Sequence, residues 1–292
     1  MNSNTLKRGF VATVLLVFFS IQVSSQSAAP NIDIPKLLKE CIANGEKSEQ
    51  AVIDLYTYTK KTTARTGIRD TVAVVDVYPK SGRVSEKKVS VNGNALSKNA
   101  DEKEQKRVAD ELERDATERQ TRSGDAPNRL RYGFYGKFVV SILDFLTISD
   151  FSSPRMERYH DKDLLVLDFR TRADFRPDDY TQYPLAHLQG TVWIDVDKKL
   201  PMRIEAWPKS GNAKPYKPGG SSVRKDRPVT FEYTILPEGT WVISFAQFIT
   251  VYDPIVFNGL KYYVSIEYKN YKRFVTSVGD PAIVDPKNKK KP

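Results

Sequence analysis

Apolar and polar residues alternate with a period of two along most of the chain beyond residue 52. Successive side chains of a β-strand point to opposite faces, so this alternation predicts antiparallel strands with one apolar and one solvated face. Segments 188–195 and 200–206 carry matching apolar rows around a charged turn, which predicts a hairpin. The other predicted strands are 52–59, 71–78, 84–91, 155–160, 164–171, 229–235, 241–252 and 260–274.

Three segments have a helical pattern instead. Residues 35–44 predict a short helix, with a proline near its first turn and Gly45 at its end. Residues 98–122 predict an exposed helix, because oppositely charged residues recur there at i,i+4 spacing. Residues 130–148 predict an apolar helix that must lie against other apolar surface. One face of that helix carries Phe134, Phe138, Ile142 and Phe145.

The expected fold is therefore of the α+β class and mostly β. It is a curved antiparallel sheet, or half-barrel, that covers one or two helices, with 98–122 as a charged helical insertion. Long strands in such a sheet usually curl, and helices 35–44 and 130–148 are the candidate covers of the concave apolar side. For 130–148 two roles stay open: a lid over a groove that accommodates lipid, or a helix that packs as part of the core.

The amino terminus has the layout of a secretory signal peptide. Lys7 and Arg8 precede an apolar run over 10–19, and small residues follow just before Gln26. The alternative is that the segment stays uncleaved as an anchor. We expect residues 1–25 to be removed on secretion across the inner membrane, which leaves a soluble periplasmic protein. Its parts are a single domain over 26–285, in which 97–150 is the helical insertion or lid, and a basic disordered tail over 286–292.

Positive charge is concentrated in two places. The chain has a formal net charge of +10, and segment 207–227 holds six basic residues against one acidic residue. The tail adds four lysines. One interpretation is contact with an anionic membrane surface through Lys214, Lys217, Arg224 and Lys225. The other is plain solvation of flexible segments. Nucleic acid is not an expected partner, because no aromatic stacking platform is interleaved with the basic residues.

Residues suited to catalysis or metal binding are few. Cys41 is the single cysteine and there are two histidines, His160 and His187, which excludes an intramolecular disulfide framework, a cysteine zinc site and a three-histidine metal site. Two Asp-x-Asp pairs, 161/163 and 195/197, lie in predicted tight turns, where aspartate bonds to local backbone. The Ser-x-x-Lys match at 85–88 falls in a strand and lacks its companion motifs. We predict no catalytic residue, no metal and no cofactor, with a hydrolase as the third-ranked hypothesis.

Two sequence features resemble a known family. The early strand contains Tyr56-Thr-Tyr58, and the hairpin reads Gly190-x-x-Trp-Ile-Asp followed by Leu200-Pro-x-Arg-x-Glu205. Together with export and the helical insertion, these resemble the LolA/LolB/RseB-like superfamily of periplasmic lipoprotein carriers. The resemblance implies a non-enzymatic cavity that holds acyl chains.

The resulting hypothesis is an exported, monomeric carrier or binding protein. It holds a lipophilic ligand, an acyl chain or lipoprotein anchor, in the concave face of the half-barrel. The alternative is an envelope structural or interaction protein that docks a partner through helix 98–122. Whether the cavity is open or filled by the protein's own side chains stays undecided here. The predicted cavity residues are Phe134, Phe138, Ile142, Phe145, Leu167, Phe169, Ile194, Met202, Phe231 and Tyr262.

Overall fold

The computed structural model describes residues 32–66, 69–80, 83–119, 132–134, 138–177, 183–209, 228–251 and 261–274. The helices in this part of the chain are α1 (Ile34–Leu55), α2 (Lys98–Arg119), α3 (Ile142–Ile148) and the short 3-10 helix η1 (Tyr183–His187). The first strands are β1 (Tyr56–Thr66), β2 (Arg69–Lys80), β3 (Arg83–Val91), β4 (Asn94–Ala95), β5 (Tyr132–Phe134) and β6 (Phe138–Val140). The others are β7 (Ser149–Tyr159), β8 (Lys162–Thr171), β9 (Leu188–Asp195), β10 (Leu200–Pro208), β11 (Val229–Ile235), β12 (Trp241–Val251) and β13 (Lys261–Arg273).

Eleven of the strands form one sheet in the order β4-β3-β2-β1-β13-β12-β11-β10-β9-β8-β7. Neighbouring strands are antiparallel throughout, and the sheet does not close into a barrel. Strands that are neighbours in this sheet also follow one another in the chain, with one exception: β1 pairs with the last strand, β13. Strands β5 and β6 pair only with each other. The expected fold class is confirmed.

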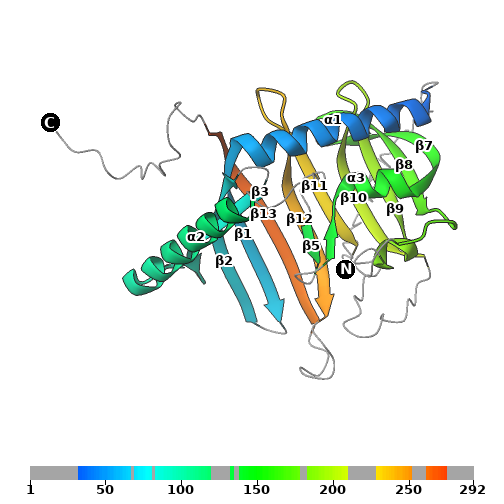
Figure 1. Cartoon of the computed structure of the whole chain (residues 1–292). Helices are drawn as coiled ribbons and strands as arrows, with labels where there is room; N and C mark the ends of the chain where they lie inside the picture. The colour runs from blue at the N-terminus through cyan, green and yellow to red at the C-terminus, as the bar shows by residue number, and fades with distance from the viewer. Residues whose placement is uncertain are drawn as a thin grey trace, which may run out of the picture.

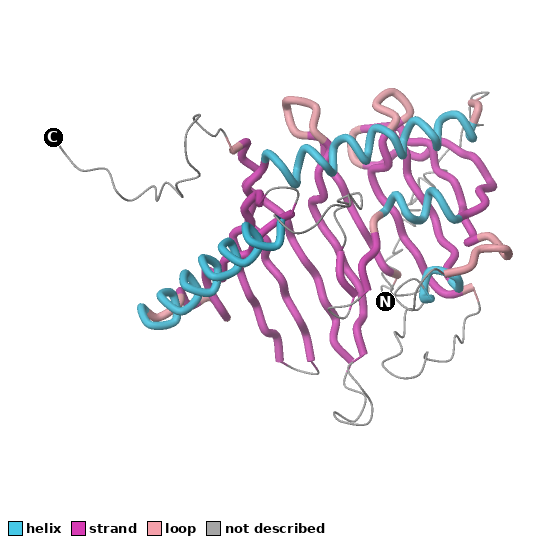
Figure 2. The backbone as a smooth tube through the Cα atoms, in the orientation of Figure 1, coloured by secondary structure: helices cyan, strands magenta, loops and turns pink. Residues whose placement is uncertain are grey.

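Helices α1 and α3 lie on the same face of the sheet (Figures 1 and 2). We call this face the inner face and the opposite one the outer face. Figure 1 shows α1 crossing the strands near one end of the sheet, with the shorter α3 beside it over the β8–β10 half. One hydrophobic cluster includes residues of both helices and of the inner-face rows of the strands. The core of the protein is therefore the layer between the inner face and these two helices.

Helix α1 is longer than the sequence predicted. Its first turn forms as expected, because Asp33 accepts a hydrogen bond from the backbone nitrogen of Lys36 at 3.0 Å. The helix then passes through Gly45, the predicted stop, and ends at Leu55. A side chain at Gly45 would meet Leu143 of α3, since a Cβ built there comes within 2.6 Å of the Leu143 Cδ2 atom. Gly45 is a packing residue, and the first four residues of predicted strand 52–59 belong to the helix.

The prediction of a single helix over 130–148 is wrong. Residues 132–134 and 138–140 are paired strands, and the helix covers only Ile142–Ile148. Ser141 sets its start through a capping box: its hydroxyl accepts from the Leu143 nitrogen at 3.1 Å, and Asp144 accepts from the Ser141 nitrogen at 2.9 Å. A short strand with apolar residues on both faces has the same sequence pattern as a helix that is apolar on every side. Periodicity alone therefore could not distinguish strand from helix over 132–140.

Helix α2 confirms the predicted charged helix as far as Arg119, where the described stretch ends. It packs on β3 near one edge of the sheet and extends away from it (Figure 1). Glu104 accepts from the backbone nitrogen of Lys88 at 2.8 Å, and Arg107 donates to the Glu86 carbonyl. On this side of β3, β4 pairs only with Ser90 and Val91. The two α2 side chains therefore bond to backbone groups of β3 that β4 does not reach.

The strands of the second half follow the sequence prediction closely. Segments 188–195 and 229–235 have the predicted bounds, and the others differ by a few residues, most at the start of β7, which begins at Ser149. The predicted Asn92-Gly93 turn is present, with φ of 51° and 79°.

Among the described helices, none combines the length and apolarity that a membrane span requires. The predicted signal peptide and basic tail lie outside the described residues.

Candidate functional site

The inner face brings together seven of the ten predicted cavity residues. Phe145 of α3 lies against Phe169 of β8, with ring centroids 5.6 Å apart. Ile142 packs in the same cluster and has no exposed surface. The remaining four lie on neighbouring strands and are at most 9% exposed: Leu167, Ile194, Met202 and Phe231. The sequence thus placed these side chains on the correct face.

The other predicted site residues lie partly or wholly outside the described part of the structure. Phe134 and Phe138 lie in β5 and β6, and Tyr262 lies in β13, but their side chains are outside the described part of the structure. The predicted membrane-contact residues, Lys214, Lys217, Arg224 and Lys225, lie outside the described residues altogether.

In this conformation the inner face beneath α3 is filled by the protein's own side chains, as far as the described residues show. Ile142, Leu167 and Ile194 have no accessible surface, so they border no space that admits a water molecule. Gly190 shows how close the packing is: a Cβ there would lie 1.9 Å from the Glu205 carbonyl oxygen and 2.7 Å from the Phe169 ring. A ligand at this face therefore requires that part of the cover move away.

A buried polar contact joins the two covering helices. The Ser141 hydroxyl, at the start of α3, donates to the Glu49 carboxylate of α1 at 2.7 Å, and Glu49 is 2% exposed. Tyr233 of β11 lies near Glu49. Burial is the larger cause, and the negative charge of Glu49 the next, that raises the pKa of the Tyr233 hydroxyl well above its usual value. Its ring stacks on Trp241, with centroids 3.9 Å apart. A carboxylate in an apolar layer costs free energy unless it is bonded, so this contact fixes where α3 sits.

The outer face carries a network of charged and aromatic side chains. The Arg203 guanidinium lies over the rings of Tyr159 and Trp193, at 5.5 and 5.6 Å from their centroids. The same guanidinium pairs with Glu205 and Glu232. These contacts link β10 to β9 through Trp193 and to β11 through Glu232, and so stabilise the pairing of the three strands.

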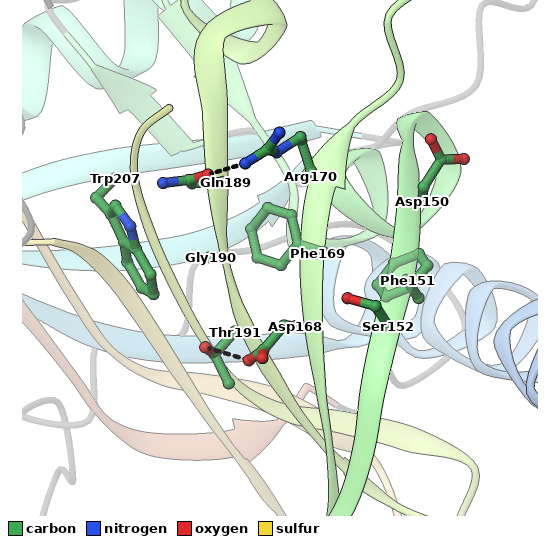
Figure 3. Close-up of a pocket in the computed structure, with 10 residues that line it drawn as sticks. All are labelled: Asp150, Phe151, Ser152, Asp168, Phe169, Arg170, Gln189, Gly190, Thr191 and Trp207. Carbon is green, nitrogen blue, oxygen red and sulfur yellow. Dashed lines mark hydrogen bonds between the residues drawn. The ribbon is translucent and has the colours of Figure 1, made fainter. Parts of the chain in front are cut away.

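A pocket of about 670 Å³ opens on the outer face over β7 to β10 (Figure 3). Two cross-strand pairs frame it. Arg170 donates to the Gln189 side chain at 3.1 Å, and Thr191 donates to Asp168 at 3.2 Å. In Figure 3 these two pairs lie on opposite sides of the Phe169 ring, with Trp207 at one flank and Asp150 at the other. The full lining is Asp150, Phe151, Ser152, Asp168, Phe169, Arg170, Gln189, Gly190, Thr191 and Trp207.

Sequence reasoning missed this pocket. The alternation along the predicted strand 164–171 puts Asp168 and Arg170 on its solvated side, and in the structure both line the outer-face pocket. A sequence signal of the pocket is Trp207, a large aromatic residue in an outward position near the end of β10. Its neighbours across the strands could not be identified without the strand register.

The weaker chemical candidates stay dispersed. His160 lies in the turn between β7 and β8 with φ of 52°, while His187 is the last residue of η1. Asp195 confirms its predicted turn role, because it accepts from the backbone nitrogen of Lys198 at 2.9 Å. Within the described residues, no three metal-ligating side chains of the His, Cys, Asp and Glu types come together.

No protein-family model matches the chain, and no curated protein matches it either. Several solved structures are similar to it. A domain described as an outer membrane lipoprotein-sorting protein from Vibrio parahaemolyticus is 11% identical with a TM-score of 0.38, over 82% of this chain and 92% of that one. A LolA superfamily protein from Nitrosomonas europaea is 13% identical with a TM-score of 0.33, over 83% of this chain and 94% of that one.

A DUF1329 family protein from Desulfovibrio piger is 11% identical with a TM-score of 0.33, over 82% of this chain and 93% of that one. The names of two of these similar structures, a LolA superfamily protein and a lipoprotein-sorting domain, agree with the resemblance stated from the residues.

Proposed function

We propose that the protein is a non-enzymatic carrier that holds a lipophilic ligand, an acyl chain or a lipoprotein anchor, against the inner face. The observation that carries this proposal is the inner face itself: one apolar surface on an open sheet, closed by helices rather than by a second sheet. Each methylene buried there contributes about 0.8 kcal/mol, so a single acyl chain binds usefully without any polar partner.

Helix α3 is the part of the cover that we expect to move, and we call it the lid. It has 7 residues, and so short a helix depends on packing for its stability. Helix α1 has 22 residues and is tied to the sheet at a turn, where Lys199 pairs with Glu40 at 3.0 Å and Asn44 donates to the Lys199 carbonyl at 3.4 Å. Opening at α3 uncovers Phe169 while leaving α1 in place.

The direct test is binding of a dansyl-labelled undecanoic acid, together with native mass spectrometry of the gently purified protein. We expect a saturable rise and blue shift of dansyl emission, and co-purified lipid in the mass spectrum. The variant Phe145→Ala removes the lid's contact with Phe169 and should speed the uptake of the probe. Thr147→Ala, an exposed position on the same helix, is the matched control. A protein that carries no lipid and gives no saturable signal contradicts the proposal.

Export to the periplasm is part of the proposal and rests on residues 1–25. Amino-terminal sequencing of the protein recovered from the periplasmic fraction should begin at Gln26. We also propose that Lys214, Lys217, Arg224 and Lys225 contact anionic lipid. Vesicles of phosphatidylglycerol should then bind the protein more tightly than vesicles of phosphatidylcholine, and replacing these four residues with glutamine should remove the difference.

Helix α2 supports a second candidate, an interaction role. It packs on β3 and leaves a charged surface exposed, which includes Lys103 and Lys106. Charge reversal at both positions should abolish capture of an envelope partner and leave binding of the dansyl probe unchanged. If capture by the reversed variant equals that of the wild type, α2 has no docking role.

A further inference from the structure

The polar residues of the outer-face pocket lie on the opposite side of the sheet from the proposed lipid site, and Phe169 borders both. Side chains of successive residues in β8 point to opposite faces: Phe169 packs under α3, whereas Asp168 and Arg170 line the pocket. The volume of about 670 Å³ lies within the range of small-molecule sites. Carriage of an acyl chain on the inner face makes no use of this pocket.

The polar groups of the pocket are set in position by their neighbours. Asp168 is held by the Thr191 hydroxyl at 3.2 Å and by Arg155 at 3.1 Å. Arg170 is held by Gln189, a bond that uses one of the five N–H donors of its guanidinium. The side chains of Asp168 and Arg170 are therefore held in position before any ligand binds. Less side-chain conformational entropy is then lost on binding.

The charges of the lining nearly balance, which disfavours a strongly charged ligand. Two carboxylates, Asp150 and Asp168, face one guanidinium, Arg170. Beside the pocket, Arg155 pairs with Asp168. Lys209 also lies close, but its ammonium donates to the carbonyls of two backbone residues at 2.8 and 3.0 Å.

Trp207 supplies the apolar part of the recognition surface. An indole is a flat apolar plate, and Trp207 lies at the flank of the pocket with the two polar pairs beside it (Figure 3). A pyranose ring fits this combination, because its C–H face packs on an aromatic plate while its rim of hydroxyls bonds to amide, carboxylate and guanidinium groups. A purely apolar ligand would cover the N–H donors of Arg170 that Gln189 does not use, and would offer them no acceptor.

We propose that this pocket binds a neutral sugar ring, either as a free saccharide or as the headgroup of a glycolipid. Trp207 is the stacking plate, and the Arg170–Gln189 and Thr191–Asp168 pairs contact the hydroxyls. No residue of α3 lines the pocket, and its link to the lid is Phe169, which contacts Phe145 of α3.

The test measures binding by saturation-transfer NMR and by quenching of tryptophan fluorescence. The probes are maltose, cellobiose and N-acetylglucosamine, with glucuronate and inorganic phosphate as charged comparisons. The glycolipid source is tested with phosphatidylcholine vesicles that contain or lack digalactosyldiacylglycerol. Saturable binding of a neutral sugar identifies a saccharide site. Binding only to the glycolipid vesicles identifies a headgroup site. No binding in either arm, or tighter binding of glucuronate or phosphate, overturns the proposal.

Variants assign any binding to the pocket. Trp207→Ala should weaken it at least about fivefold, Trp207→Phe should weaken it less, and Gln189→Ala should weaken it by a similar factor. Thr234→Ala, an exposed position of β11 outside the pocket, is the matched control. Circular dichroism of each variant checks the fold, and Trp207→Phe keeps the test valid if the alanine variant is unfolded. Equal binding by the Trp207→Phe, Gln189→Ala and wild-type proteins would overturn the assignment.

Discussion

The Ser141 hydroxyl donates to the Glu49 carboxylate at 2.7 Å, and the same oxygen accepts from the Leu143 nitrogen at 3.1 Å. One side chain thus starts α3 and anchors it to α1. Because Glu49 is buried, this hydrogen bond adds to the packing of the five buried apolar residues of α3 in holding the lid in place.

Ser141→Ala should destabilise the protein by about 2 to 4 kcal/mol, because it removes a helix cap and a hydrogen bond to a buried carboxylate. Ser141→Thr keeps the hydroxyl and should lose much less. Urea denaturation measures the difference. Probe uptake by Ser141→Ala should also be faster than by the wild type if α3 is the lid. An alanine variant as stable as the threonine variant would show that the hydroxyl contributes nothing.

Gly45→Ala should press on Leu143 and displace the lid. Alanine favours a helix over glycine by up to about 1 kcal/mol, but Leu143 is fully buried and cannot easily make room, so we expect a net loss of about 1 kcal/mol. A double-mutant cycle with Leu143→Ala measures the coupling, which should be clearly above zero. Lys47→Ala, exposed on the same helix, controls for helix propensity. Additive effects would contradict the contact.

Gly190→Ala should be far more damaging than Gly45→Ala. Here the new Cβ meets the Glu205 backbone carbonyl at 1.9 Å as well as the Phe169 ring, and a backbone atom of a paired strand cannot rotate away. We expect a loss of at least about 3 kcal/mol, or no folded protein. Shortening the ring with Phe169→Leu should not rescue the variant. A soluble Gly190→Ala protein with wild-type thermal stability would refute the predicted backbone clash.

Acid should release α2 from β3. The Arg107 guanidinium and the Lys88 backbone N–H lower the pKa of Glu104 to about 2, from 4.5 in the unfolded chain. The stabilisation is therefore fully present above pH 4.5 and is lost as the pH falls from there towards 2. The protection factor of the Lys88 amide, which is its exchange rate relative to the unfolded chain at the same pH, should fall over that range, and Glu104→Ala should show low protection already at pH 7. A protection factor that stays constant over this range in the wild type would exclude this role.

The Cys41 thiol should resist modification in the native protein. Burial raises its pKa to about 12, so at pH 8 it is both covered and protonated. Labelling by Ellman's reagent should occur only on unfolding. Adding undecanoic acid should leave the thiol protected, because the proposed ligand moves α3 and not α1. Rapid labelling in the presence of the fatty acid would show instead that α1 opens.

Much of the sheet could be predicted from local pattern, because its strands expose one face and bury the other. The row Leu165, Leu167 and Phe169 is buried as expected, while Asp168 and Arg170 face outward. The pattern failed where both sides of a segment are apolar. Residues 132–140 lie in such a stretch, and the capping box at Ser141 was the local signal that marked the true start of the helix.

Long-range features left no local trace. Gly45 looks like a helix stop in sequence, and only the neighbouring Leu143 explains why a glycine is tolerated inside α1. The pocket depends on the register that sets Gln189 beside Arg170 and Thr191 beside Asp168. That register follows from tertiary pairing, so the outer-face site could not be read from residue types alone.

The first and last strands of the sheet in chain order, β1 and β13, pair with each other, with Tyr56 opposite Arg273. A chain still emerging from the ribosome lacks β13 until the other ten strands of the sheet have been synthesised. Until then, its two halves each present a strand edge without a neighbour, which invites pairing with other chains. The two halves can therefore join only after residues 261–273 have been synthesised, and a truncation before residue 261 should leave an aggregation-prone product.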